Sequence, residues 1–277
     1  MRHIDHIVVA VHDLHQAGDF YRRLGFQVGA RNQHPWGTEN RIIQFGSSFI
    51  ELITAGANPE LIPPHRAHRF SFGAFVRDYL REREGLAMLV LSSSDAHGDS
   101  ELFAASGIGD FEVFSFERSG VKPDGTATRV AFSLAFARDS HAPRAGFFVC
   151  QQHLPENFWD SRFQRHPNRA GNITAVELAT PAPAQHVQFF TAFTGAQPQS
   201  HPSGGYSLPI DGGRIDILHH AAWPLPSPQL TSFTVKVDDI ENLASILTAE
   251  KIPFTNIGNT LVISDHRASG IEIRFNL

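Results

Sequence analysis

Two side chains in the first quarter of the chain are of the types that bind metals or move protons. His6 stands in an apolar run near the N-terminus, and Glu51 stands between Ile50 and Leu52. Side chains alternate between the two faces of a strand, so Glu51 is expected to share a face with other apolar residues. An ionised carboxylate in such surroundings needs a cation or strong hydrogen-bond donors. A neutral imidazole and a carboxylate together suit Zn²⁺, Mn²⁺, Ni²⁺ or Fe²⁺ better than Ca²⁺.

The elements that must position these two groups follow an order that occurs four times. Within residues 3–54, a β-branched run predicts a strand, and apolar residues at helical spacing predict a helix that stops at Gly25. Three strand-like stretches follow at residues 26–30, 41–45 and 48–54. The same βαβββ order returns in residues 86–152, 172–220 and 230–277. Independent errors would not reproduce one order four times.

Four such units predict an α+β protein of two domains. A βαβββ unit of this size exposes one face of its sheet and must pair with a second unit to bury it. We therefore expect a first domain over residues 1–153, with a long connector at 55–85, and a second domain over 172–277. Residues 154–171, which contain Pro, Asn and Gly, are the predicted linker.

Composition excludes several classes of function. The formal net charge of −5 and the absence of a long Lys/Arg run argue against nucleic acid as a partner. Cys150 is the single cysteine, so a disulfide framework and a Cys-rich zinc module are excluded. The N-terminal apolar run is too short for a signal peptide or a membrane span, so we expect a cytoplasmic protein without a membrane partner. Glycine-rich nucleotide loops and a serine nucleophile elbow are missing.

Three segments carry a resemblance to a known superfamily. They are DHIVVAVHDL (residues 5–14), FYRRLGF (20–26) and FIEL (49–52). With the repeated unit, they resemble the vicinal-oxygen-chelate superfamily of glyoxalases, bleomycin- and fosfomycin-resistance proteins and extradiol dioxygenases. In that superfamily a His or Gln on the first strand of a unit and a Glu on the fourth bind a divalent metal. The resemblance therefore implies His6 and Glu51 as metal ligands.

Further contacts come from two other places. The segment HPWGTEN (residues 34–40) resembles the glyoxalase-like subgroup, which implies that His34 and Asn40 line the cavity. In the second unit, alignment by the helix ends puts Met88 at the place of His6. Four possible donors stand at residues 150–153, and which of them would complete a metal site stays open. The predicted substrate contacts are His34, Asn40, Cys150, Gln151 and His153.

The second domain offers a weaker set of groups. Ser232 stands at the place of His6, and Asp216 and Glu272 stand at the fourth-strand positions without a histidine or glutamine beside them. A site that has lost its function and serves structure or contact within a homodimer is the favoured interpretation, ahead of a second metal site.

These observations lead to one function and two alternatives. The resemblance implies a glyoxalase-like, metal-dependent enzyme that performs isomerase or lyase chemistry on a small oxygenated substrate, with Glu51 as ligand and base. The first alternative is a metal-free protein that binds a small molecule, as bleomycin-resistance relatives do, which the 23 phenylalanines favour. The second is an extradiol-type dioxygenase, which needs two histidines and a carboxylate. The basic segment 63–69 either holds an anionic substrate or is a solvated connector, and 55–85 can form a lid.

Overall fold

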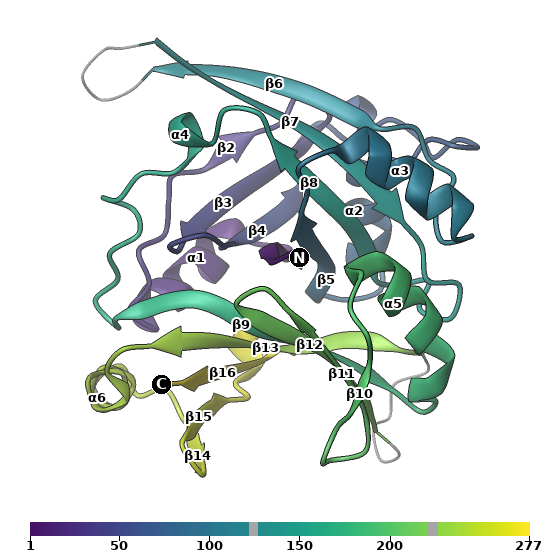
Figure 1. Cartoon of the computed structure of the whole chain (residues 1–277). Coiled ribbons are helices and arrows are strands. Elements are labelled where there is room, and N and C mark those ends of the chain that lie inside the picture. Colours follow the sequence, from purple (N-terminus) through teal and green to yellow (C-terminus); the bar gives the residue numbers. More distant parts are fainter. Residues whose placement is uncertain (122–126, 221–226) are drawn as a thin grey trace.

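Two eight-stranded sheets form the molecule in the computed structural model, which describes residues 1–121, 127–220 and 227–277 (Figure 1). The strands of the first sheet are β1 (Ile4–Ala10), β2 (Asn32–Gln33), β3 (Thr38–Gln44), β4 (Phe49–Ala55), β5 (Gly85–Ser92), β6 (Phe114–Val121), β7 (Ala127–Ala137) and β8 (Gly146–Gln152). The strands of the second are β9 (Ala170–Thr180), β10 (Gln199–Ser200), β11 (Gly205–Ile210), β12 (Gly213–His219), β13 (Gln229–Val237), β14 (Thr255–Ile257), β15 (Thr260–Ile263) and β16 (Glu272–Asn276).

The strand order confirms the predicted α+β class with paired βαβββ units. The first sheet has the order β2-β3-β4-β1-β5-β8-β7-β6, and the second has the order β10-β11-β12-β9-β13-β16-β15-β14. In the first sheet, β1 runs parallel to β4 and antiparallel to β5, which in turn runs parallel to β8. The second sheet repeats this arrangement with β12, β9, β13 and β16. Each sheet is therefore built from two units that meet at their first strands.

The helices of the described residues are α1 (Leu14–Arg23), α2 (Phe72–Leu80), α3 (Ala96–Ala105), α4 (Pro155–Phe158), α5 (Val187–Thr194) and α6 (Ile240–Ala249), with 3-10 turns at Pro59–Leu61, Pro183–His186 and His266–Ala268. Four of these six helices, α1, α2, α3 and α6, begin where a short polar residue accepts a hydrogen bond from the first turn. Asp13 caps α1 by accepting from the backbone N–H of His15 at 2.7 Å. Asp239 caps α6 in the same way. Such caps stabilise a helix by about 1 kcal/mol each and explain why helix starts are readable from sequence.

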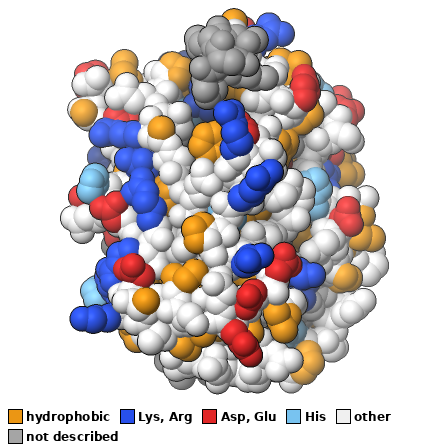
Figure 2. Space-filling model, turned by 90° about the vertical axis from the view of Figure 1, so that its left-hand side faces the viewer, with side chains coloured by type: hydrophobic (Ala, Val, Ile, Leu, Met, Phe, Trp, Pro, Cys, Tyr) orange, Lys and Arg blue, Asp and Glu red, His pale blue; other side chains and the backbone are white. Residues whose placement is uncertain are grey.

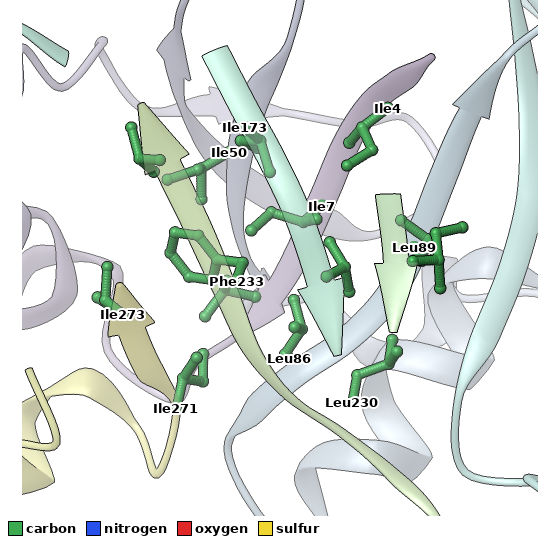
Figure 3. Close-up of a cluster of buried hydrophobic side chains, with 14 of the residues drawn as sticks. Ile4, Ile7, Ile50, Leu86, Leu89, Ile173, Leu230, Phe233, Ile271 and Ile273 are labelled. Atoms are coloured by element: carbon green, nitrogen blue, oxygen red, sulfur yellow. The ribbon is translucent and has the colours of Figure 1, made fainter. Parts of the chain in front are cut away.

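A shared apolar core joins the two sheets. The face of the first sheet that carries Ile7 and Leu89 lies against the face of the second that carries Ile173 and Phe233, as Figure 3 shows. All four side chains are buried. Each contributes about 1.5–3 kcal/mol to folding through the removal of apolar surface from water. The opposite, concave face of the first sheet stays free to line a site.

The connector between β4 and β5 closes one end of this concave face. It contains α2, whose Val76 and Tyr79 pack against Val8, Ala10 and other residues of the concave face. The connector for which the sequence suggested a lid thus contains a helix, α2, whose apolar face is buried.

Residues 26–30 form no strand, contrary to expectation. Gly29 donates one backbone hydrogen bond to Ile42 at 2.9 Å, but Phe26 turns into the core, where its ring lies 6.0 Å from that of Phe275 and 5.6 Å from that of His166. Packing between the sheets therefore replaces the edge strand that the local pattern favours.

The outer surface carries mixed charges. On the face drawn in Figure 2, basic and acidic side chains are interspersed, with hydrophobic side chains between them. No helix in the described ranges is long and apolar enough to cross a membrane.

Candidate active site

The register of β1 and β4 places His6 and Glu51 on the same concave face. His6 lies beside Phe49 in the parallel pairing, and Val8 lies beside Glu51. The His6 ring stacks on Phe49 with a centroid separation of 4.2 Å and an angle of 13°. The alternation of side chains along each strand therefore brings the two groups to one cavity, as the sequence indicated.

An aromatic cavity surrounds these groups. Its lining residues are His6, His34, Trp36, Asn40, Ile42, Phe49, Glu51, Phe72, Phe114, Phe116, Arg118, Phe132, Leu134, Phe148, Cys150 and Phe158. The free space is about 60 Å³, several times the roughly 10–15 Å³ that a single water molecule needs. The cavity thus has flat apolar walls and a few polar groups, the usual composition of a small-molecule site.

His6 belongs to a hydrogen-bonded chain that fixes its tautomer. Its Nδ1 lies 2.6 Å from Oδ1 of Asp5, and Oδ2 of Asp5 accepts from Nε2 of Gln152 at 2.8 Å. A carboxylate only accepts hydrogen bonds, so in the neutral form of the imidazole Nδ1 carries the proton and Nε2 has the lone pair. Both Asp5 and His6 are buried. This arrangement orients the imidazole and makes Nε2 available as a proton acceptor or ligand.

Glu51 is held by a second polar chain. Asn40 donates through Nδ2 to Oε1 of Glu51 at 2.5 Å, and the same amide nitrogen lies 3.4 Å from Nε2 of His34. Nδ1 of His34 lies 2.8 Å from Oγ1 of Thr38. Burial lowers the pKa of His34 to about 4, opposed by Glu51 and assisted by Arg118. His34 is therefore neutral at pH 7, so it does not compensate the charge of Glu51.

Arg118 on β6 supplies positive charge to the cavity and was missed by the sequence reasoning. Burial lowers the pKa of its guanidinium, and the carboxylate of Glu51 opposes this change. An arginine stays charged in proteins even so. Its Nε is buried without a hydrogen-bond partner in the described part of the chain. The signal that could have found it is the alternation of Phe114, Phe116 and Arg118, which puts the three on one face of a strand.

A segment of the predicted linker completes the wall. Phe158, the last residue of α4, packs on Phe49 with ring centroids 5.1 Å apart and on Phe132 at 5.7 Å. The side chain of Gln44 donates to the backbone oxygen of Phe158 at 2.8 Å, which fixes this wall to β3. Residues 154–171 therefore cover the first sheet in addition to connecting the two.

Three of the five predicted substrate contacts lie in the cavity, namely His34, Asn40 and Cys150. Burial and the nearby carboxylates of Asp5 and Glu51 raise the pKa of the Cys150 thiol well above its ordinary value. The thiol is therefore an apolar wall group and no nucleophile.

Gln151 and His153 do not line the cavity. Gln151 follows Cys150 on β8 and points to the other face, where its Oε1 accepts from the backbone N–H of Ala96 at 3.1 Å. It thereby holds the start of α3. His153 is exposed past the end of β8, with Nε2 2.8 Å from Oγ of Ser133. Strand alternation and the end of β8 therefore decide which of residues 150–153 face inward.

The residues present do not fit a resident metal. Within residues 1–121, 127–220 and 227–277, no three His, Cys, Asp or Glu side chains come close enough together to hold an ion. The offset between α1 and α3 gives Met88 the place of His6, and with this offset the pairing of β5 with β8 gives Phe148 the place of Glu51. A catalytic metal needs about three protein ligands, and the second unit supplies apolar side chains instead.

The concave face of the second sheet carries acids that are already paired. Glu177 on β9 accepts from Nη1 of Arg274 at 2.7 Å and from Oγ of Ser232 at 3.2 Å. Asp216 on β12 accepts from Oγ of Ser207 at 2.7 Å and from Nε of Arg214 at 2.8 Å. The sequence pattern indicated Asp216 but did not indicate Glu177.

Two paired βαβββ units around a concave site define a protein of the vicinal-oxygen-chelate superfamily, which confirms the resemblance seen in the sequence. The chain belongs to the family with a glyoxalase-like domain, whose match covers residues 4–194. No curated protein sequence matches the chain significantly.

Solved structures share this fold at low sequence identity. A hypothetical protein from Staphylococcus aureus is 14% identical with a TM-score of 0.67, and the match covers 100% of this chain and 99% of that one. A mutant of 4-hydroxymandelate synthase from Streptomyces coelicolor is 11% identical with a TM-score of 0.59, covering 98% and 91%. A fusion of a xylose isomerase-like TIM barrel with 4-hydroxyphenylpyruvate dioxygenase is 12% identical with a TM-score of 0.54, covering 98% and 48%. At these identities the likeness concerns the fold alone.

Proposed function

We propose that the cavity of the first sheet binds a small, flat molecule with an anionic oxygen and a hydroxyl group, and moves a proton on it without a resident metal. The observation that carries this proposal is the presence of Glu51 and Arg118 in one cavity with no ion pair between them among the described residues. The proposal keeps the isomerase or lyase type of chemistry expected from the sequence and assigns the base to His6 instead of Glu51.

Unpaired charges in an apolar cavity destabilise the protein unless a ligand supplies hydrogen bonds or opposite charge. The Nε of Arg118 has no acceptor in the described ranges. Glu51 accepts one hydrogen bond there, from Asn40 to Oε1. A ligand carboxylate or enolate would satisfy Arg118 by a charge-assisted hydrogen bond. A ligand hydroxyl would donate to Glu51. Aromatic walls on both sides select flat molecules.

The Asp5–His6 pair supports proton transfer over simple storage of a ligand. Asp5 holds His6 as the Nδ1–H tautomer, so Nε2 can take a proton from a carbon or hydroxyl of the bound molecule. Arg118 would then stabilise the negative charge that develops on the ligand oxygen. The dioxygenase alternative lacks support, because no two histidines and a carboxylate among the described residues lie close enough together to hold an iron ion.

Binding is tested by calorimetric titration after the metal content of protein purified without chelator has been measured. The first probes are salicylate, its meta and para isomers, and 4-hydroxymandelate, the acid named in one structural neighbour. We expect binding that survives dialysis against a chelator and weakens about tenfold in Arg118→Gln, equal to about 1.4 kcal/mol. Arg129→Gln is the matched control, because Arg129 lies on the adjacent strand of the same hairpin and pairs with Glu117 at the surface.

Stoichiometric metal that disappears in both His6→Ala and Glu51→Ala would contradict the proposal and restore the metal enzyme. Binding that is equal in Arg118→Gln and Arg129→Gln would remove Arg118 from the site.

Proton transfer is tested separately by NMR, through deuterium uptake from D₂O at the carbon beside the keto group of 4-hydroxyphenylpyruvate. We expect His6→Gln to slow this exchange by about a hundredfold. Binding without any enzyme-dependent exchange would assign the cavity to a binding protein. A cytoplasmic location and a homodimer stay predictions.

A further inference from the structure

A second pocket adjoins the cavity and shares its aromatic wall. The outer pocket has a volume of about 320 Å³, and three aromatic residues, Trp36, Phe72 and Phe114, line both this pocket and the cavity of the first sheet, called the inner cavity below. Its remaining lining residues are Pro35, Leu61, Pro63, Pro64, Arg66, Arg69, Phe70, Ser71 and Gly73. No acidic side chain is among them. The connector that the sequence left as either an anion site or a solvated loop therefore forms the wall of a pocket.

The backbone holds two arginines side by side at this pocket. Arg66 and Arg69 form an antiparallel bridge, with backbone N–H groups donating to the opposite carbonyl oxygens at 3.3 and 3.2 Å. Residues directly opposite each other in such a bridge carry their side chains on the same face. His68, with a φ of 61°, makes the tight turn between them possible. The two guanidinium groups therefore project from one side of the loop.

These two positive charges have no internal counterpart. Neither arginine takes part in an ion pair within the parts of the chain that the structure describes. By contrast, Arg77 on α2 and Arg81 directly after it both pair with Asp78. Like charges opposite each other destabilise a bridge. The start of α2 at Ser71 and Gly73 also lines the pocket and adds the positive end of a helix dipole. Every electrostatic feature of the outer pocket thus favours an anion.

The shared aromatic wall contributes an unused donor. Nε1 of Trp36 is buried and has no hydrogen-bond acceptor among the described residues. The Trp36 ring stacks on His34 at 4.6 Å, so it is held against the polar chain of the inner cavity. A buried indole N–H usually finds a partner, and a ligand oxygen would supply one.

We propose that the outer pocket binds the anionic tail of an elongated ligand whose aromatic or unsaturated body contacts Trp36, Phe72 and Phe114. This inference rests on the proposed function, because the head of the same ligand would lie in the inner cavity. It narrows the substrate class to molecules with two polar ends and a flat apolar middle. The tail is recognised by Arg66 and Arg69 as a carboxylate, sulfonate or phosphate.

The test compares two fluorescent probes that differ in one group. Anilinonaphthalene sulfonate carries an anionic sulfonate on an aromatic body, and N-phenylnaphthylamine has the same rings without the charge. We expect the wild-type protein to bind the sulfonate more tightly than the neutral probe. In the double variant Arg66→Gln/Arg69→Gln, affinity for the sulfonate should fall by about fivefold to tenfold, whereas affinity for the neutral probe should not change.

A matched control removes two positive charges elsewhere. Arg81 and Arg144 are exposed, lie outside the outer pocket and form surface ion pairs, so Arg81→Gln/Arg144→Gln changes the net charge equally. This variant should keep the preference for the sulfonate. Equal preference in the wild type and in Arg66→Gln/Arg69→Gln would overturn the inference.

The two proposals fail in different ways. If the hydroxybenzoates bind through Arg118 but the sulfonate preference ignores Arg66 and Arg69, the outer subsite is wrong and the inner cavity stands. If the sulfonate preference depends on Arg66 and Arg69 while no hydroxy acid responds to Arg118→Gln, the inner cavity assignment is wrong.

Discussion

The two sheets have the same strand order, but the buried acids on their concave faces differ in how completely they are hydrogen-bonded. In the second sheet, Glu177 is 3% exposed and accepts from Arg274 and Ser232. In the first, Glu51 is 7% exposed and accepts from the amide of Asn40, with the charge of Arg118 in the same cavity but not bonded to it. The two sheets thus share one strand order, but the acid of the second sheet has a complete set of hydrogen-bond partners and the acid of the first sheet does not.

This difference indicates where ligand chemistry takes place. A buried charge that is already paired contributes to the structure and is unavailable to a ligand. A buried charge that lacks hydrogen-bond partners destabilises the free protein. A ligand that supplies those partners removes this cost when it binds. Active sites commonly keep such groups at the expense of stability. The comparison therefore assigns function to the first sheet and structure to the second, and the following predictions test it in order of effect.

The largest expected effect is a loss of stability in acid caused by His34. Burial lowers its pKa from 6.5 to about 4, so the unfolded chain takes up a proton between pH 6.5 and pH 4 that the folded chain does not. Stability is thus unaffected by this group above pH 6.5, decreases as the pH falls through that window, and is lowest below pH 4. The full loss is about 3 kcal/mol.

Denaturant unfolding of the wild type and His34→Gln at several pH values measures this effect. His166, whose pKa burial also lowers, is present in both proteins and cancels in the difference. Parallel pH profiles for the two proteins would show that His34 takes up its proton at the same pH in both states.

Removing the cation that pairs with Glu177 should destabilise the protein. Arg274→Gln leaves Glu177 with weaker donors, and we expect a loss of about 2 kcal/mol in the free energy of unfolding, since Arg274 is partly solvated. Arg118→Gln is the matched change on the first sheet and should cost less than about 0.5 kcal/mol, because no described group depends on its hydrogen bonds. Equal losses in both variants would remove the distinction between the sheets.

Neutralising the acid of the first sheet should be harmless or favourable. Glu51→Gln keeps an acceptor for Asn40 and removes a buried charge, so we expect a gain of up to about 1 kcal/mol, read from the shift in denaturation midpoint. Glu177→Gln, which leaves Arg274 with the carboxylate of Glu272 alone, should lower the midpoint instead. A lower midpoint for Glu51→Gln would mean that Glu51 is structurally paired.

Much of the fold was predictable because it depends on local signals. Asp13 and Asp239 cap helices, Gly25 ends one, and strands of β-branched residues precede them. The offset that gave Met88 the place of His6 agrees with the pairing of β1 and β5. Residues 26–30 were misjudged because contacts between the sheets decide their path, and such contacts are not local.

A site residue was predictable only where the alternation along a single strand determines which way its side chain points. His6 and Glu51 follow from alternation, but the partnership of Asp5 with His6 does not, because neighbours on a regular strand point to opposite faces. A register shift between Ile4 and His6 in the pairing with β5 allows the two side chains to meet. Arg118 was missed because the sequence pattern of its strand is also typical of a surface hairpin. Only the curvature of the whole sheet brings this strand over the cavity.

The most direct test of the central claim observes Arg118 itself. In protein treated with a chelator, the NMR signal of its Nε–H group is assigned by its disappearance in Arg118→Gln and followed during titration with 4-hydroxymandelate or a hydroxybenzoate. The account predicts a saturable shift of this signal, retained without metal and reduced in Glu51→Gln. An unchanged Arg118 signal while the ligand binds, or binding that returns only when a divalent metal is added, would contradict it.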